Sequence, residues 1–236
     1  MKLDFRQKTP FIAGLFALAL IALTPYARPQ GTDPVDVDAV VQQLRGLPAE
    51  LYAGPGSYLC NPAPSPCPPP PLPPAEMKRQ HIYSQLSALG SASVPALARG
   101  LQNADVGVKR NAALALYVLS NESSSSDRVT RRVDIRAALP ALIAALQDSD
   151  SRTAALAAQA IGNIGATGVA AVPILLRLLN SEDEALRSSA CIALGGIGPS
   201  AKSALPRLNR ALADPSPDVQ GFARLAIAKI NASAPP

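Results

Sequence analysis

The fold is decided by the stretch Pro140–Asp150, PALIAALQDSD, because its pattern recurs in register along the second half of the chain. Prolines stand 33 residues apart at three positions, and an earlier copy begins at Pro95. Leucines follow each proline after two and six residues, and alanines and aliphatic residues recur further on. Repeats of this length build solenoids, in which stacked helices share one core. The sequence therefore predicts an all-α, right-handed α-solenoid of about four helix pairs, with prolines at Pro95, Pro140, Pro173 and Pro206.

Each repeat is predicted to hold two helices joined by a polar corner. The proline fits the first turn of the first helix, where its missing N–H costs little. The corner Asp148-Ser149-Asp150 offers side chains that cap the second helix. Small and aliphatic residues at helical spacing predict the buried stripe of that helix. Gly165 and Gly198 are expected to end two second helices in a left-handed conformation.

The first 27 residues have the pattern of an export signal. Basic residues precede the apolar run Phe11–Leu23, which is shorter than the roughly 20 residues that a membrane span needs. Residues 1–27 are therefore predicted to be a cleaved signal peptide or an uncleaved signal anchor. We expect an extracytoplasmic protein that is periplasmic, secreted or anchored. Membrane contact is expected only through this segment, if it is not cleaved.

Residues 28–74 are predicted to form a short helix followed by a proline-rich linker. Asp36 is placed to cap a helix that runs to about Arg45. Nine prolines between Pro62 and Pro74 exclude regular helix or sheet. We interpret the segment as a semi-rigid spacer, and the alternative is a ligand for a proline-recognising groove.

The three cysteines suit an oxidising compartment. A disulfide is predicted between Cys60 and Cys67, and the alternative is two free thiols. The bond needs Cα atoms within about 7 Å, whereas straight polyproline geometry would hold these residues about 22 Å apart. The prolines between them must therefore turn the chain. Cys191 lies inside a repeat helix and is expected to be a packing residue.

Residues 75–94 are predicted to be a capping half-repeat, and residues 95–236 the full repeats. A helix over Ala75–Leu89 would be the cap, with Gly90 matching the later helix-ending glycines. The first full repeat is 12 residues longer than the others, and the extra residues fall within Asn121–Val133. This insertion is interpreted as a solvated loop, with a loop on the binding side as the alternative.

Pro140–Asp150 resembles a HEAT repeat of the short type found in phycobilisome-lyase-like proteins. Ala193–Gly198 resembles the ending of the second helix in that family. The corner signature of an acidic, an aliphatic and a basic residue occurs at Asp105, Val108 and Lys109, while Ala154 replaces the basic residue in the Pro140 repeat. The resemblance covers about residues 75–231 and implies the fold. It does not imply one function, because such repeats serve many tasks.

Two enzymes of the family give expectations that this chain does not meet. Bilin lyases act in the cytoplasm, which conflicts with the export signal. Deoxyhypusine hydroxylases bind iron through paired His-Glu motifs, and the single histidine here, His81, is followed by Ile82. We therefore expect no catalytic residues, no metal and no cofactor. The net charge of +5 is spread along the chain and is too weak for a nucleic-acid footprint.

A partner-binding surface is predicted from the helical angle of each second-helix residue, taken at about 100° per residue. The positions farthest from the buried stripe would lie on the concave side in this family. An apolar row along them would suit a peptide or partner helix, unless neighbouring helices bury it. The predicted residues are Arg110, Leu114, Tyr117, Arg152, Gln159, Ser188, Ile192 and Leu225.

The sequence thus predicts a non-catalytic module that binds or scaffolds another protein or peptide in the cell envelope. The alternative is a lyase- or hydroxylase-like enzyme related to the same family.

Overall fold

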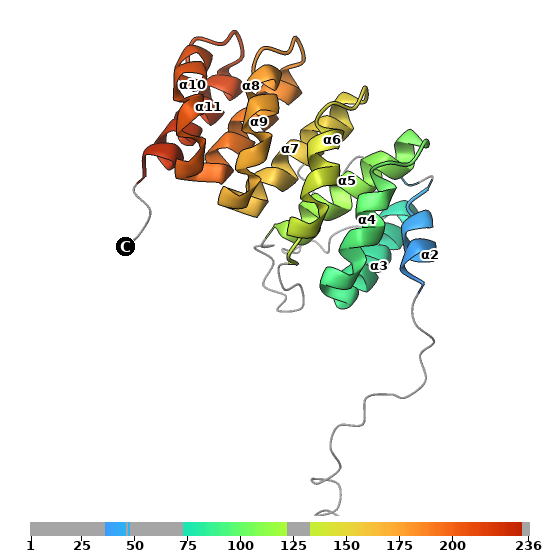
Figure 1. Cartoon of the computed structure of the whole chain (residues 1–236). Helices are drawn as coiled ribbons and strands as arrows, with labels where there is room; N and C mark the ends of the chain where they lie inside the picture. Colours follow the sequence, from blue (N-terminus) through green and yellow to red (C-terminus); the bar gives the residue numbers. More distant parts are fainter. Residues whose placement is uncertain (1–35, 46, 48–72, 122–132, 233–236) are drawn as a thin grey trace, which may run out of the picture. The chain divides into compact units, whose positions relative to one another are not determined.

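A computed structural model describes residues 36–45, 47, 73–121 and 133–232, which form helices and no strand (Figure 1). Three predicted features lie outside these residues. They are the export signal, the Cys60–Cys67 disulfide and the body of the insertion in the first repeat. Most of the proline-rich linker lies outside them as well.

Four helix pairs follow one another along the described part of the chain. The second helices stack in chain order, with α5 on α7, α7 on α9 and α9 on α11 (Figure 1). The prediction of an all-α solenoid with about four helix pairs is confirmed. The pairs are α4 (Val94–Gly100) with α5 (Val106–Ser120), α6 (Leu139–Ala145) with α7 (Ser151–Ile164), α8 (Val172–Leu178) with α9 (Glu184–Ile197), and α10 (Leu205–Ala211) with α11 (Pro217–Asn231).

Each first helix begins with the repeated proline in its first turn, as predicted. Proline suits this position because its fixed φ is already helical and no N–H is needed there. A short 3-10 helix leads into each of these helices. These segments are η1 (Gly90–Ser93), η2 (Arg136–Ala138), η3 (Gly165–Ala171) and η4 (Gly198–Ala204).

Gly165 and Gly198 end their helices with positive φ, at 77° and 68°, but not in the predicted left-handed helical conformation. Their ψ values lie near −140°, a region that only glycine occupies without strain. Gly90 ends α3 (Pro74–Leu89) in the same conformation, with φ of 57°. The helix predicted from Ala75 begins one residue earlier. Its shared ending makes α3 the counterpart of a second helix.

One continuous core runs through the stack, from Val40 in α2 (Val37–Gln42) to Ile230 in α11. The first leucine after each repeated proline is fully buried, and so is the first recurring alanine of each second helix. Because each repeat shares this core with its neighbours, no repeat buries its apolar side chains alone.

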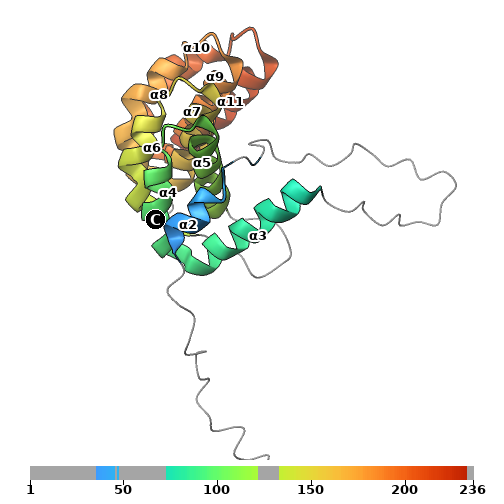
Figure 2. The ribbon, with the colours of Figure 1, turned by 90° about the vertical axis from the view of Figure 1, so that its right-hand side faces the viewer.

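The N-terminal helix α2 belongs to this stack. Asp36 caps it by accepting from the amides of Asp38 and Ala39, as predicted, and the helix ends three residues before Arg45. Val40 and Val41 are buried. The helix packs against α3, α4 and α5 at one end of the stack (Figure 2). The sequence predicted the helix but not this packing.

The stretch Ser151–Leu178 is long and apolar enough to cross a membrane by length and composition. In the structure, Gly165 divides it into α7, η3 and α8. Helix α7 packs between α5 and α9, with Ala157 and Ile161 fully buried. The core of the solenoid accounts for the apolar character of this stretch.

Candidate functional site

The polar corners cap the second helices, as predicted. The carboxylate of Asp105 accepts from the amides of Gly107 and Val108, and Asp150 and Asp183 cap their helices in the same way. Ser216 has this role in the last repeat. Such caps satisfy amides that have no partner within the helix. They also fix the side chains that join one repeat to the next.

Ion pairs across the repeat boundaries explain the corner signature. At the boundary between the first and second repeats, Lys109 Nζ lies 2.5 Å from Asp148 Oδ2. At the boundary between the third and fourth repeats, Arg187 Nε lies 2.9 Å from Asp214 Oδ2. Between these two boundaries the basic position holds Ala154, and Ser181 stands where the acidic partner would be. Both members of this pair are therefore replaced together. The basic residue of the signature therefore joins its repeat to the next one.

Arg110, predicted to bind a partner, also joins two repeats. Its Nε lies 3.1 Å from Asp150 Oδ2 of the following repeat. The hydrogen bond from Arg110 is the main cause of the lowered pKa of Asp150, whose ordinary value is 3.8. Arg110 thus has a structural partner within the chain.

The predicted apolar row is not continuous. Leu114 is fully buried, Ile192 is half-buried and Leu225 is 60% exposed. The prediction that Leu114 faces a partner is therefore wrong. Its helical angle gave a direction within one helix, whereas packing in the stack determines whether a side chain is covered. Tyr117, in the same helix, is half-buried and packs against the core.

Two of the remaining predicted residues lie in the second repeat. The Gln159 side-chain amide donates to Ser189 Oγ at 3.1 Å, so Gln159 interrupts the apolar row. Arg152 is exposed in the first turn of α7. These two side chains make this part of the predicted surface polar.

The accessible part of the predicted surface lies in the last two repeats. We call it the α9–α11 surface and define it by exposed or half-buried side chains of the two neighbouring helices. It combines an apolar centre with two cations. Its residues are Ser188, Ile192, Arg224, Leu225, Ala228 and Lys229. Arg224, Ala228 and Lys229 were not among the predicted site residues and are added because they are exposed on α11 beside Leu225.

Glycines hold these helices close together. A Cβ atom on Gly195 would lie 2.9 Å from Ala226 Cα, and one on Gly162 would lie 3.0 Å from Ala193 Cα. Both glycines are therefore helix contacts. Because the backbones approach so closely, the exposed side chains of α9 and α11 lie on adjoining helices with little freedom between them.

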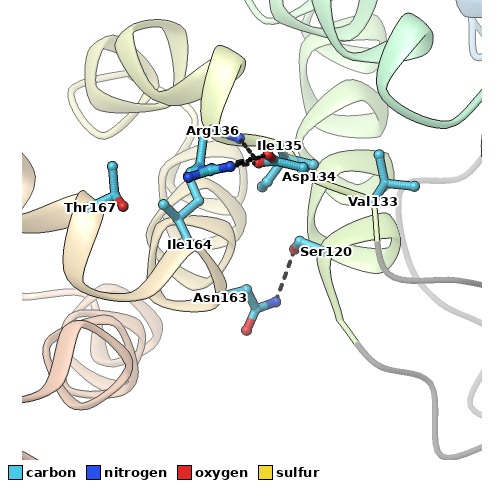
Figure 3. Close-up of a pocket in the computed structure, with 8 residues that line it drawn as sticks. All are labelled: Ser120, Val133, Asp134, Ile135, Arg136, Asn163, Ile164 and Thr167. Atoms are coloured by element: carbon cyan, nitrogen blue, oxygen red, sulfur yellow. Dashed lines mark hydrogen bonds and ion pairs between the residues drawn. The ribbon is translucent and has the colours of Figure 1, made fainter. Parts of the chain in front are cut away.

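A second feature is a pocket of about 300 Å³ between the ends of α5 and α7 (Figure 3). Four of its polar side chains form two pairs. Arg136 turns back onto Asp134, with Nε 2.9 Å from Oδ1, and Asn163 Nδ2 donates to Ser120 Oγ at 3.0 Å. The lining residues are Ser120, Val133, Asp134, Ile135, Arg136, Asn163, Ile164 and Thr167.

This pocket lies beside the ends of the insertion. The amide of Val133 donates to the carbonyl of Leu119 at 2.9 Å, so the chain leaves and rejoins the stack at adjacent points. The insertion itself, residues 122–132, is outside the described part of the chain.

His81 and Cys191 lie in different surroundings. His81 is exposed on α3, and its Nε2 lies 3.1 Å from Gln85 Nε2. Cys191 is fully buried, and burial raises its thiol pKa to about 12. Among the residues that the structure describes, no three His, Cys, Asp or Glu side chains are grouped to hold a metal ion.

Comparison with known families identifies the repeat. Residues 139–228, which include α6 to most of α11, match the HEAT repeats family. These residues form HEAT repeats. No curated protein matches the sequence.

Solved structures with the same fold include two that are similar over most of this chain. An engineered protein is 20% identical, with 83% of this chain and 79% of that chain covered and a TM-score of 0.52. The complex of CpcE and CpcF of phycocyanin lyase from Nostoc is 21% identical, with 89% and 70% covered and a TM-score of 0.53. At these identities the similarity shows the fold alone.

Proposed function

We propose that this HEAT repeat protein is a non-catalytic scaffold in the cell envelope that binds another protein or a peptide through its α9–α11 surface. The observation that carries the proposal is the placement of Ile192 and Leu225. They occupy equivalent positions on helices in glycine contact, and Leu225 is 60% exposed. A preformed surface of this kind binds without having to order itself first.

The chemistry of the surface favours an amphipathic helix or extended peptide as the bound element. Ile192 and Leu225 offer apolar contacts on two adjoining helices. Arg224 and Lys229 flank Leu225 on α11 and would attract carboxylates at the edge of a bound segment. The partner is therefore proposed to present apolar side chains between acidic ones.

Crosslinking tests this assignment directly. A photoreactive amino acid in place of Leu225, in the full chain expressed in its native host, should yield a discrete adduct that mass spectrometry can identify. The same group in place of Ser203, an exposed residue of η4, serves as the control. Identical adducts from both positions, or none from Leu225, would contradict binding at this surface.

The envelope location rests on the basic residues and apolar run at the N-terminus. A fusion of alkaline phosphatase to the C-terminus should be active, since that enzyme needs an oxidising compartment to form its disulfides. Deletion of residues 1–27 should abolish the activity. An inactive fusion of the intact chain would count against export.

The competing function is a lyase- or hydroxylase-like enzyme. The phycocyanin lyase complex shares the fold with this chain, but at 21% identity this supports architecture only. Metal analysis of purified protein separates the two proposals. Stoichiometric, tightly bound iron would favour the enzyme over the scaffold.

A further inference from the structure

The last repeat differs from the earlier ones in its cations. In the earlier repeats, most cations pair with carboxylates; Arg99 with Asp38 and Lys109 with Asp148 are examples. The last repeat contains five exposed cations with no acidic partner among the described residues. They are Lys202, Arg207, Arg210, Arg224 and Lys229.

Two of these cations occupy positions that are apolar in every inner repeat. Arg224, on α11, matches small residues that are fully buried. They are Ala113, Ala158 and Cys191. Arg207, on α10, matches residues that are buried or half-buried. They are Ala96, Ala141 and Ile174. Within the stack, these positions are covered by neighbouring helices, whereas in the last repeat they are exposed.

The direction in which this surface points follows from helix contacts. Gly195 on α9 faces Ala226 of the next second helix, and its equivalent on α11 is the exposed Ala228. Arg224 lies four residues before Ala228 and therefore on the same side of the helix. We call the surface formed by Arg207, Arg224 and Ala228 the end face. It lies on α10 and α11, at the end of the stack opposite α2 (Figure 1).

Apolar side chains lie near these cations. Ile227 and Leu212 are only partly buried, although their equivalents in the inner repeats are buried. Those equivalents are Leu116, Ile161 and Leu194 for Ile227, and Leu101, Leu146 and Leu179 for Leu212. The end face therefore combines partly exposed apolar residues with cations, and interfaces commonly have an apolar centre and a polar rim.

We propose that the end face docks a helical segment of an acidic protein partner. That helix would take the place that the next helix pair takes inside the stack, and its carboxylates would pair with Arg207 and Arg224. The inference rests on the proposed protein-binding function and adds Arg207 on α10 to a contact that shares Arg224 and Ala228 with the α9–α11 surface. The end faces of two copies do not fit against each other, because they would present like charges.

Peptide binding to the full chain tests the proposal. The probe is a labelled helical peptide of about 20 residues with a leucine stripe between glutamates, compared with a twin in which lysines replace the glutamates. Fluorescence anisotropy should show binding of the acidic peptide only, weakening as salt is raised. Arg207→Glu/Arg224→Glu should weaken binding about tenfold or more, and Arg207→Glu alone, which leaves the α9–α11 surface unchanged, should weaken it about threefold or more. The control, Lys78→Glu/Arg177→Glu, makes the same change in net charge at exposed residues away from this face and should leave binding unchanged.

Three outcomes would overturn the inference. Equal weakening of peptide binding in both double variants would show that the peptide responds to the net charge of the protein and not to the end face. Wild-type binding to vesicles of phosphatidylglycerol, lost in Arg207→Glu/Arg224→Glu, together with no binding of the peptide, would make the face a membrane contact. Unchanged peptide affinity in Arg207→Glu would show that the end face does not bind the peptide, whereas a Leu225 crosslink would still support the scaffold function. Circular dichroism of each variant confirms that the stack is folded.

Discussion

Arg187 and Asp214 are joined by two hydrogen bonds, each 2.9 Å long, across the boundary between the third and fourth repeats. Their side chains are only 14% and 9% exposed. Arg187 also donates to the carbonyl oxygens of Ser181 and Glu182. The guanidinium therefore joins the corner of its own repeat to the corner of the next one.

Removing this guanidinium should destabilise the stack. Arg187→Ala leaves Asp214 poorly solvated without its cation, and we expect the free energy of unfolding to fall by about 1–3 kcal/mol in urea titrations. Arg136→Ala is the control, because its pair with Asp134 is local and exposed. Equal losses in the two variants would argue against a special role for the boundary pair.

Acid should weaken the same boundary. The hydrogen bond from Arg187 lowers the pKa of Asp214 from its ordinary 3.8. A carboxylate with a lowered folded-state pKa stabilises the fold above its unfolded-state pKa, and this contribution is lost as pH falls through the folded-state value. Wild-type stability should therefore decline below about pH 4. The decline should be shallower in Arg187→Ala, and parallel curves would contradict the linkage.

The N-terminal helix should depend on one buried amide. Asn111 Nδ2 donates to the carbonyl oxygens of Leu44 and Leu47, at 3.1 and 3.0 Å. Asn111→Ala removes this buried donor from both carbonyls, so we expect a loss of about 1–3 kcal/mol and faster hydrogen exchange in α2. Asp38→Ala, which removes an exposed pair with Arg99, should have little effect. Unchanged exchange in the Asn111 variant would refute this dependence.

Close helix packing should make two glycines respond in opposite ways. Gly195→Ala places a Cβ 2.9 Å from Ala226 Cα and should destabilise the protein by about 1–3 kcal/mol. Gly221→Ala, within α11, meets no atom within 4 Å and should stabilise it by about 0.5–1 kcal/mol. Thermal unfolding of both variants provides the comparison, and destabilisation by both would contradict it.

The buried thiol should report opening of the stack. With Cys60 and Cys67 changed to serine, Cys191 is the remaining cysteine. Burial raises its pKa to about 12, so little thiolate forms at pH 8 and a disulfide reagent should react slowly. Urea should accelerate the reaction in parallel with unfolding. Rapid labelling of the native protein would show that the α9 region opens on its own.

The repeat pattern was sufficient to predict most of the fold. Pro140 and its equivalents mark the first turns of helices, and Gly165 marks a helix end, because local backbone chemistry determines both features. The packing of α2 could not be predicted in this way. Asn111 contacts Leu44 across 67 residues of chain, and no local signal encodes such a contact.

The binding surface was only partly predictable. Leu114 and Leu225 occupy the same position in their repeats, yet the first is buried and the second exposed. Their difference comes from their surroundings: α5 packs against α3 and α7, whereas α11 has a second helix on one side only. The role of Arg110 was missed for a similar reason, because Asp150 lies in the next repeat.

The first full repeat has Ser120 where α7 and α9 are followed by Gly165 and Gly198, and there the backbone continues extended at Asn121 instead of turning. The backbone hydrogen bond from Val133 to Leu119 brings the two ends of the insertion close together. The entropic cost of closing a loop whose ends are held together grows only with the logarithm of the loop length. This position is therefore suited to insertions: we expect that a tag or a small domain can replace residues 122–132 while the stack of helices stays intact.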